Sequence, residues 1–242
     1  MTPHDEPAAV RERYARRTAG DPRYHPLQPD VWQARLERER VLLRRLAALG
    51  WRDLASRRAT DVGCGDGGQL LDLLRLGFAP AHLTGIELLA ARHAAARERL
   101  PERVALWLGD ACDAPVEPGS QDLVLQSTVF SSLLDDAFQQ RLAEAMWRWL
   151  RPGGGIWWYD FTRDNPRNPD VRGVSPARVR ALFPHGTIRG RRVTLAPPLA
   201  RIACRRHPAL YPLLNALPPL RTHWLAWIGK PAAPGRNEEF IA

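Results

Sequence analysis

The sequence predicts a single α/β domain in which helices cover both faces of a doubly wound, mostly parallel sheet. Its 242 residues include 45% hydrophobic side chains, which is enough for one sizeable core and short for two. Strand-like segments alternate with helix-like segments from Ala59 to Phe161, and this alternation implies right-handed crossovers between parallel strands. A glycine-rich turn follows the first of these strands, at the point where such sheets bind ligands.

Residues 1–50 are predicted to form an N-terminal helical flap or lid. Residues 1–28 are rich in proline and poor in core-like side chains. Residues 30–49 carry leucines at helical spacing, so we predict a helix with Asp30 as its N-cap and Gly50 just after its end.

Residues 51–162 are predicted to form the ligand-binding core. Short apolar runs bounded by turn residues indicate its strands. The predicted strands are Ala59–Val62, His82–Glu87, Val104–Leu108, Asp122–Gln126 and Gly155–Phe161. The predicted helices between them are Gly68–Leu76, Leu89–Leu100 and Asp135–Leu150.

Residues 163–242 are predicted to complete the same domain. Prolines and asparagines in residues 162–176 indicate a loop, and Ser175 followed by Pro176 indicates the start of a short helix. Two more strands are predicted at Thr187–Ala196 and Thr222–Ile228. Between them, Leu199–Leu217 mixes leucines, prolines and arginines, so we expect it to pack on the substrate side of the sheet, or else to contact a membrane or an apolar substrate.

The formal net charge of +9 is unevenly distributed along the chain. It is +5 for residues 1–60, −6 for residues 61–160 and +10 for residues 161–242. An excess of positive charge suggests an anionic partner such as a nucleic acid. Lys230 is the only lysine, however, and a bias of genome composition toward arginine also produces such an excess.

The sequence predicts a cytoplasmic protein without a metal centre. Its cysteines, Cys64, Cys112 and Cys204, lack the spacing of a disulfide framework or a zinc site. Residues 1–7 lack the basic start and apolar run of a signal peptide, and we expect no membrane-spanning segment.

The strongest local feature is the turn Asp61-Val62-Gly63-Cys64-Gly65-Asp66-Gly67-Gly68. Its glycines permit a sharp turn and close approach to a ligand, and the helix after it presents free N–H groups. The glycine spacing also fits a dinucleotide site, with Glu87 holding ribose hydroxyls. Asp61 distinguishes the two ligands, because a carboxylate at this point repels a pyrophosphate but suits the ammonium and sulfonium of S-adenosylmethionine.

This turn resembles motif I of the class I S-adenosylmethionine-dependent methyltransferases. Four further segments resemble the later motifs of that family in order and spacing, namely Thr84–Glu87, Gly109–Ala111, Ser120–Gln126 and Leu150–Gly155. The resemblance is strongest to bacterial small-molecule methyltransferases near the ubiquinone and menaquinone biosynthesis group. It implies a Rossmann-like sheet of about seven strands with an antiparallel C-terminal strand. Arg57 and Arg58 depart from the usual apolar start of the first strand, so we expect that strand to be short.

The resemblance also implies roles for individual residues. Asp61, Gly63 and Gly65 would hold the methionine end of the cofactor, Glu87 the ribose, and Asp110 with Ala111 the adenine. The remaining predicted cofactor contacts are Cys64, Gly67, Leu88, Gln126 and Ser127.

The end of the last core strand is predicted to meet the methyl acceptor. Asp160 is the first candidate for a general base or an orienting carboxylate, with Tyr159 beside it. In the alternative, Tyr159 packs into the core and Asp160 caps a loop. The predicted acceptor contacts are Tyr14, Tyr24, Phe130, Asn165 and Arg221.

Three functions remain open from the sequence. The favoured one is methyl transfer from S-adenosylmethionine, with S-adenosylhomocysteine as product, to a small molecule that is anionic or lipid-linked. A nucleic-acid methyltransferase is a second, although no nucleic-acid partner is expected because base-specific motifs are absent from the sequence. A nicotinamide-dependent oxidoreductase or a cofactor-sensing protein is the third. The sequence does not specify an oligomeric state.

Overall fold

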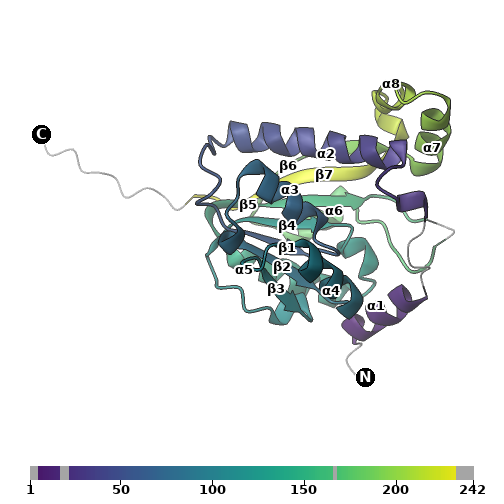
Figure 1. Cartoon of the computed structure of the whole chain (residues 1–242). Helices are drawn as coiled ribbons and strands as arrows, with labels where there is room; N and C mark the ends of the chain where they lie inside the picture. Colours follow the sequence, from purple (N-terminus) through teal and green to yellow (C-terminus); the bar gives the residue numbers. More distant parts are fainter. Residues whose placement is uncertain (1–4, 17–21, 166–167, 233–242) are drawn as a thin grey trace, which may run out of the picture.

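A seven-stranded sheet lies at the centre of the computed structural model, which describes residues 5–16, 22–165 and 168–232 (Figure 1). The strand order is β3-β2-β1-β4-β5-β7-β6. Strands β1 to β5 pair in parallel, and β7 is antiparallel to both β5 and β6. The strands are β1 (Ala59–Val62), β2 (Leu83–Glu87), β3 (Ala105–Leu108), β4 (Gln121–Ser127), β5 (Leu150–Phe161), β6 (Thr187–Leu195) and β7 (Arg221–Gly229).

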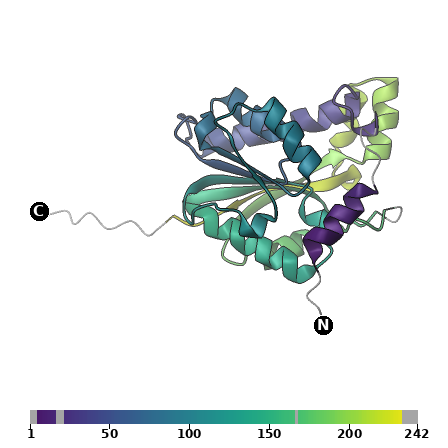
Figure 2. The ribbon, with the colours of Figure 1, turned by 60° about the horizontal axis from the view of Figure 1, so that its bottom comes forward.

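Helices cover both faces of this sheet, and each face has its own core (Figure 2). Side chains from α2, α3 and α4 pack on one face, and side chains from α1, α5 and α6 pack on the other. Alternation along the strands supplies both cores, since Leu123 and Leu125 of β4 face the first and Val124 faces the second. The helices are α1 (Glu6–Ala15), α2 (Pro29–Ala48), α3 (Gly68–Leu76), α4 (Ala90–Arg99), α5 (Asp136–Trp149), α6 (Pro176–Leu182), α7 (Pro197–Arg206) and α8 (Leu210–Asn215).

The predicted doubly wound sheet is confirmed, with element ends that differ by a few residues from the prediction. The largest difference is β5, which begins at Leu150 rather than Gly155. Asp30 is not the N-cap of α2 as predicted. The helix begins at Pro29, with Gln28 at the cap position, so Asp30 lies in the first turn. Gly50 follows the helix with φ +69°, in the left-handed conformation that its position predicted.

The first strand is short, as the two arginines before it indicated. Asp122, buried at the start of β4, forms ion pairs with Arg57 and Arg151 and accepts a hydrogen bond from the backbone N–H of Arg58 at 3.0 Å. The arginines therefore tie the beginning of the sheet together, which is the reason why charged residues are tolerated there.

The segment Leu199–Leu217 forms most of two helices, α7 and α8, which the sequence did not resolve individually. They pack on α2 and β6 around a small core of Leu195, Ala200, Cys204 and Tyr211. In Figure 1 they project beside the beginning of α2.

Two further observations concern membrane-spanning helices and cysteine thiols. No helix among the described residues is long and apolar enough to cross a membrane. The thiols of Cys64, Cys112 and Cys204 are all free.

Candidate cofactor site

A pocket opens where the parallel strands β1 to β4 end, as is usual for ligand sites in such sheets. Its lining includes the residues that follow each strand end and three residues of α1. From the strand ends come Val62, Gly63, Glu87, Leu88, Gly109, Asp110, Ala111, Ser127 and Thr128, and from α1 come Pro7, Val10 and Tyr14.

The turn after β1 requires glycine at its first position. Gly63 has φ +65°, and a Cβ atom there would lie 2.6 Å from a methyl carbon of Val129. Val129 follows β4 and also lines the pocket. Gly63 therefore allows two chain segments from neighbouring strands to meet at the pocket.

Asp61 is a completely buried carboxyl group with one unsatisfied oxygen. Its Oδ1 accepts a hydrogen bond from Nε2 of Gln69 at 3.0 Å, whereas Oδ2 has no partner among the described residues. Burial, with a further contribution from the nearby Glu87, raises the pKa of Asp61 well above its ordinary value. A positively charged ligand group near Oδ2 would favour the ionised form, so this site suits a cation.

Glu87 lies at the end of β2 and is held by the backbone on both sides. Its Oε2 accepts from the N–H of Gly65 at 2.8 Å, and its Oε1 accepts from the N–H of Leu89 at 2.9 Å. Each carboxylate oxygen can accept a second hydrogen bond. The carboxylate therefore presents two fixed acceptors at the pocket, a geometry suited to a pair of ligand hydroxyls.

Asp110 and Ala111 line the pocket at the end of β3. Oδ1 of Asp110 also accepts from the N–H of Cys112 at 2.9 Å and so caps the short turn Ala111–Asp113. Asp110 thus holds its own loop in place while lying at the pocket, where the resemblance to the family predicts an adenine contact.

Five predicted cofactor contacts are not among the residues that line the pocket, namely Asp61, Cys64, Gly65, Gly67 and Gln126. Gly65 and Gly67 shape the turn, and the buried Cys64 packs in the core on the α3 face, where burial raises the pKa of its thiol. The amide of Gln126 is engaged by the protein, accepting from the N–H of Val129 at 3.2 Å and donating to the carbonyl of Tyr159 at 3.4 Å. We therefore correct the placement of Gln126, which supports the segment after β4. Leu88 and Ser127 do line the pocket.

The helix α1 roofs the pocket, and a buried ion pair anchors it. Nη2 of Arg13 lies 2.5 Å from Oε1 of Glu6, and it also donates to the carbonyl of Ser132 at 2.9 Å. The same Glu6 oxygen accepts from the N–H of Leu134 at 2.7 Å. These bonds join α1 to the segment that follows β4, and Figure 2 shows α1, in purple, beside the ends of the strands.

Neither Glu6 nor Arg13 was singled out from the sequence. A local signal existed, since Asp5 and Pro7 form a helix start in which the Asp5 side chain accepts from the N–H of Ala8. That signal predicts a helix, but it does not predict that the helix packs against the segment after β4.

Tyr14 lies in the pocket lining, as predicted for an acceptor contact. Its hydroxyl is 3.2 Å from Oγ of Ser132, and the guanidinium of Arg92 lies 4.7 Å from the centre of its ring. Arg92 and Ser132 line the pocket as well, and both were missed from the sequence. The side chain of Tyr24 lies outside the described part of the chain.

The two predicted catalytic residues are buried at the end of β5, outside the pocket lining. Asp160 accepts hydrogen bonds from the N–H groups of Ser131 and Phe161 at 3.1 and 3.0 Å. Burial raises the pKa of Asp160 to about 7, and these hydrogen bonds partly oppose the rise. The alternative in which Asp160 holds a loop is therefore the one that the geometry supports.

Tyr159 points to the opposite face of the sheet. Its hydroxyl lies 3.0 Å from Oγ1 of Thr194, and its ring stacks on His223 with 4.7 Å between the ring centres. The guanidinium of Arg38 lies 4.5 Å from the ring centre, and its Nη1 donates to Oγ of Ser127 at 3.2 Å. Arg38, from α2, thus connects this stack with a residue of the pocket lining, a link that no sequence signal indicated.

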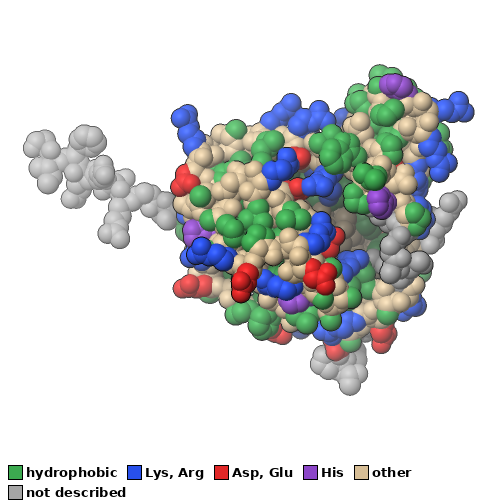
Figure 3. All heavy atoms as spheres, viewed as in Figure 1, with side chains coloured by type: hydrophobic (Ala, Val, Ile, Leu, Met, Phe, Trp, Pro, Cys, Tyr) green, Lys and Arg blue, Asp and Glu red, His purple; other side chains and the backbone are tan. Residues whose placement is uncertain are grey.

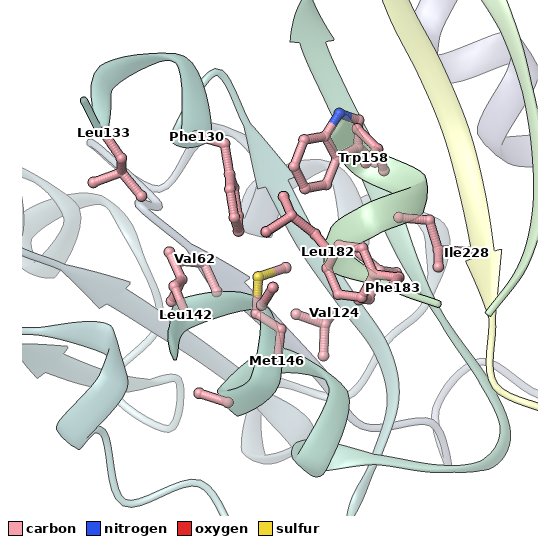
Figure 4. Packing of buried hydrophobic residues seen from close by; sticks show 14 of the residues in the cluster. Val62, Val124, Phe130, Leu133, Leu142, Met146, Trp158, Leu182, Phe183 and Ile228 are labelled. Atoms are coloured by element: carbon pink, nitrogen blue, oxygen red, sulfur yellow. The ribbon is translucent and has the colours of Figure 1, made fainter. Parts of the chain in front are cut away.

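Three predicted acceptor contacts lie outside the pocket lining, contrary to the prediction. Phe130 is completely buried and packs on Trp158, with 4.5 Å between ring centres (Figure 4). Asn165 lies exposed in the loop after β5. The guanidinium of Arg221 donates to the carbonyls of Asn215 and Arg192 at 2.6 and 3.2 Å, so it clamps α8 to β6.

Backbone strain marks the segment after β4. Thr128 has φ +57°, an uncommon value for a residue with a branched side chain, and it lines the pocket directly after Ser127. Its N–H donates to the carbonyl of Tyr159 at 2.8 Å. Such strain persists where surrounding contacts enforce it, and it is often found at functional sites.

Comparison with known proteins identifies the family to which the residues around this pocket are similar. Residues 59–154 match the family described as methyltransferase domain. The chain carries a class I methyltransferase domain. This enzyme uses S-adenosylmethionine, and the chemistry of the unsatisfied Asp61 oxygen and of the fixed Glu87 acceptors is compatible with its charged and hydroxylated groups. A search of curated proteins found no match.

Solved structures of methyltransferases share the fold at low sequence identity. An S-adenosylmethionine-dependent enzyme from Mesorhizobium loti is 16% identical with a TM-score of 0.58, over 80% of this chain and 98% of that one. A possible histamine N-methyltransferase from Thermotoga maritima is 15% identical with a TM-score of 0.60, over 91% and 99%. Phosphoethanolamine N-methyltransferase 1 of Haemonchus contortus is 17% identical with a TM-score of 0.61, over 97% of this chain and 51% of that one.

The strand order separates the methyltransferase from the nicotinamide-dependent alternative. A dinucleotide-binding sheet of the doubly wound type has six parallel strands in the order 3-2-1-4-5-6. Here β7 is inserted antiparallel between β5 and β6. The oxidoreductase reading of the glycine spacing was therefore wrong.

Proposed function

We propose that this methyltransferase transfers the methyl group of S-adenosylmethionine to a small molecule that is anionic or lipid-linked. One observation carries the proposal, namely that Pro7, Val10 and Tyr14 of α1 form one side of the pocket at the strand ends. A roofed pocket admits a small acceptor more readily than a base within a folded nucleic acid, which must be flipped out to be reached. The closer resemblance to ubiquinone and menaquinone enzymes stays a prediction.

In this proposal, the cofactor is held by the strand-end acids. Asp61 holds the cationic methionine end, with Gly63 and Gly65 letting the backbone approach it. Glu87 accepts the ribose hydroxyls, and Asp110 with Ala111 contacts the adenine. What supports these assignments is the buried, unsatisfied Oδ2 of Asp61 and the backbone-held carboxylate of Glu87.

S-adenosylmethionine supplies an electrophilic methyl group on a sulfonium, which is displaced in line by the acceptor. The protein must therefore orient the acceptor and exclude water, and orientation alone is worth about 7–11 kcal/mol of the barrier. We assign these tasks to Tyr14, Ser132 and Thr128, which line the pocket beside α1. Asp160 and Tyr159 act as positioning residues, since they fix the segments on which these side chains lie.

An anionic acceptor is supported by two arginines beside the pocket, whose two acids, Glu87 and Asp110, are assigned to the cofactor. Arg92 lines it, and Arg38 reaches Ser127 from the other side of β4. A cytoplasmic location is part of the proposal, and the three free thiols support it because thiols persist in reducing compartments.

Transfer from methyl-labelled cofactor tests the proposal directly. The purified chain is incubated with phosphoethanolamine, with a small-molecule extract of bacterial cells, with an extract of bacterial lipids, and with total RNA. Label in a small-molecule or lipid product, absent with the Asp61→Ala variant, is the expected result. Label only in a polymer that nuclease degrades would overturn the small-molecule assignment and leave the methyltransferase itself intact.

A further inference from the structure

The C-terminal part of the chain contains a long stretch without acidic residues. No Asp or Glu occurs between Asp170 and Glu238, whereas 12 of the 35 Lys and Arg residues lie there. The helices α7 and α8 belong to this stretch, so no acidic side chain of these helices offsets the arginines beside them.

The outer face of α8 is entirely apolar. Its exposed residues are Pro212 and Leu213, followed after one helical turn by Ala216 and Leu217. The spacing places Pro212, Leu213 and Ala216 on one side of the helix and its C-cap, and Leu217 follows directly after the cap. Leu213 is 66% exposed and Leu217 is 54% exposed, so neither is covered by another part of the described chain.

The outer face of α7 combines apolar and basic side chains. Pro198, Ile202, Arg205 and Arg206 are exposed, and their spacing puts them on one side of the helix. Ile202 is 62% exposed. The opposite side packs into the core through Ala200, Ala203 and Cys204. Figure 3 shows apolar and basic side chains side by side on this projection of the molecule.

We propose that the outer faces of α7 and α8 bind the surface of an anionic lipid bilayer. Helices with an apolar face and flanking cations lie in the interface of such membranes, where the apolar side chains enter the headgroup boundary and the cations meet acidic lipids. The side chains named above supply both parts, and neither helix carries an acidic side chain that would repel the lipid charge.

The composition of this face favours lipid over RNA or a folded protein partner. Surfaces that bind single-stranded RNA stack bases on exposed aromatic rings. The outer faces of α7 and α8 expose leucine, isoleucine and proline instead, and the aromatic Tyr211 is buried. The arginines on these faces are attracted to any anionic surface, so a protein partner with a particular arrangement of acidic residues is not required.

The proposed lipid-binding faces of α7 and α8 lie at the same edge of the sheet as the pocket. Strand β6 runs parallel to β5 and ends at Leu195, at the same edge of the sheet as the pocket. Helix α7 begins two residues later, at Pro197, and packs on α2. Membrane binding would hold this edge of the sheet near the lipid. The inference does not depend on the acceptor proposed above, because binding is measured without methyl transfer.

Sedimentation of the full chain with vesicles tests the inference. The expected result is binding to phosphatidylcholine vesicles that contain phosphatidylglycerol, with much weaker binding to phosphatidylcholine alone and loss of binding at high salt. Replacing both Arg205 and Arg206 by Gln should weaken binding about 25-fold, about fivefold for each charge near the surface. Replacing both Leu213 and Leu217 by Ser should weaken it at least about tenfold.

Matched controls separate this face from the rest of the surface. Leu43→Ser removes a leucine of α2 that is 41% exposed, and Arg148→Gln removes an exposed arginine of α5. Both controls should bind like the wild type, and every variant should keep the wild-type melting temperature and affinity for S-adenosylhomocysteine. No binding of the wild type to anionic vesicles, equal binding to neutral ones, or equal losses in the controls would each overturn the inference. Binding of RNA without binding of vesicles would overturn it as well.

Discussion

Glu6 and Arg13 form an ion pair within α1, and their side chains are only 1% and 10% exposed. Each also bonds the segment after β4, through the N–H of Leu134 and the carbonyl of Ser132. The pair is therefore shared between the roof of the pocket and one of its walls. Charges in such a place stabilise a structure only while both remain, because one charge alone is buried without a partner.

Removing one member of this pair should loosen the roof. Arg13→Gln leaves the Glu6 carboxylate buried and unpaired, a change that costs about 3–5 kcal/mol in comparable cases. We expect α1 to detach, and the affinity for S-adenosylhomocysteine to fall about tenfold or more because α1 lines the pocket. Calorimetry measures the affinity, and hydrogen exchange in residues 6–15 reports the detachment. Arg11→Gln, at an exposed position of the same helix, is the control and should change neither.

The strand-end acids should dominate cofactor affinity. Asp61→Ala and Glu87→Ala should each weaken binding of S-adenosylhomocysteine by about 1–3 kcal/mol, the scale of a lost charge-assisted hydrogen bond. Asp66→Ala is a matched control, because Asp66 lies in the same turn but is exposed and pairs with Arg99. Titration calorimetry of the three variants decides the matter. If both acid variants bind like the wild type, the assigned site is wrong.

Gly63 should resist substitution because of Val129. Gly63→Ala places a Cβ atom 2.6 Å from the Val129 side chain in a backbone conformation that alanine disfavours. We expect overpacking to cost about 1–3 kcal/mol and cofactor affinity to fall with it. Adding Val129→Ala removes the clash and should restore part of the loss, whereas Val129→Ala alone should have a smaller effect. A double variant no better than Gly63→Ala would place the cause in the backbone alone.

Asp160 should make stability depend on pH. Its folded-state pKa is raised to about 7 from an ordinary 3.8, so between about pH 4 and pH 7 the folded chain binds more protons than the unfolded chain. The free energy of unfolding then falls as pH rises through this window and is steady above it. The side chain of the Asp160→Asn variant does not ionise. As pH rises from about 4 to about 7, the free energy of unfolding should therefore fall in the wild type relative to this variant. Urea unfolding of both proteins at several pH values measures the difference, and parallel pH profiles would contradict the burial argument.

The positions of the residues at the strand ends were predictable because local rules place them. Gly63 has a positive φ within a turn of fixed length, and Glu87 ends the next strand along the chain. Adjacent parallel strands end at the same edge of a sheet, so spacing along the chain is enough to bring such residues together. The same reasoning predicted the short first strand and the cap of α6 by Ser175.

The acceptor half was not predictable in this way, because contacts distant in sequence orient its side chains. Phe130 and Arg221 have the chemistry of pocket residues, but packing directs Phe130 onto Trp158 and hydrogen bonds direct Arg221 to the end of α8. Periodicity assigns faces along strands and helices but not in the short turn Phe130–Ser132.

The sequence by itself thus determined the class of fold, the cofactor and the edge of the sheet at which the pocket opens, since these follow from local conformation and strand order. Only the tertiary structure decided what closes the pocket. Glu6 and Arg13 meet residues more than 110 positions away, and Arg38 meets Ser127 across 89 positions. Contacts at such separations depend on how whole layers pack, and no spacing along the chain encodes them.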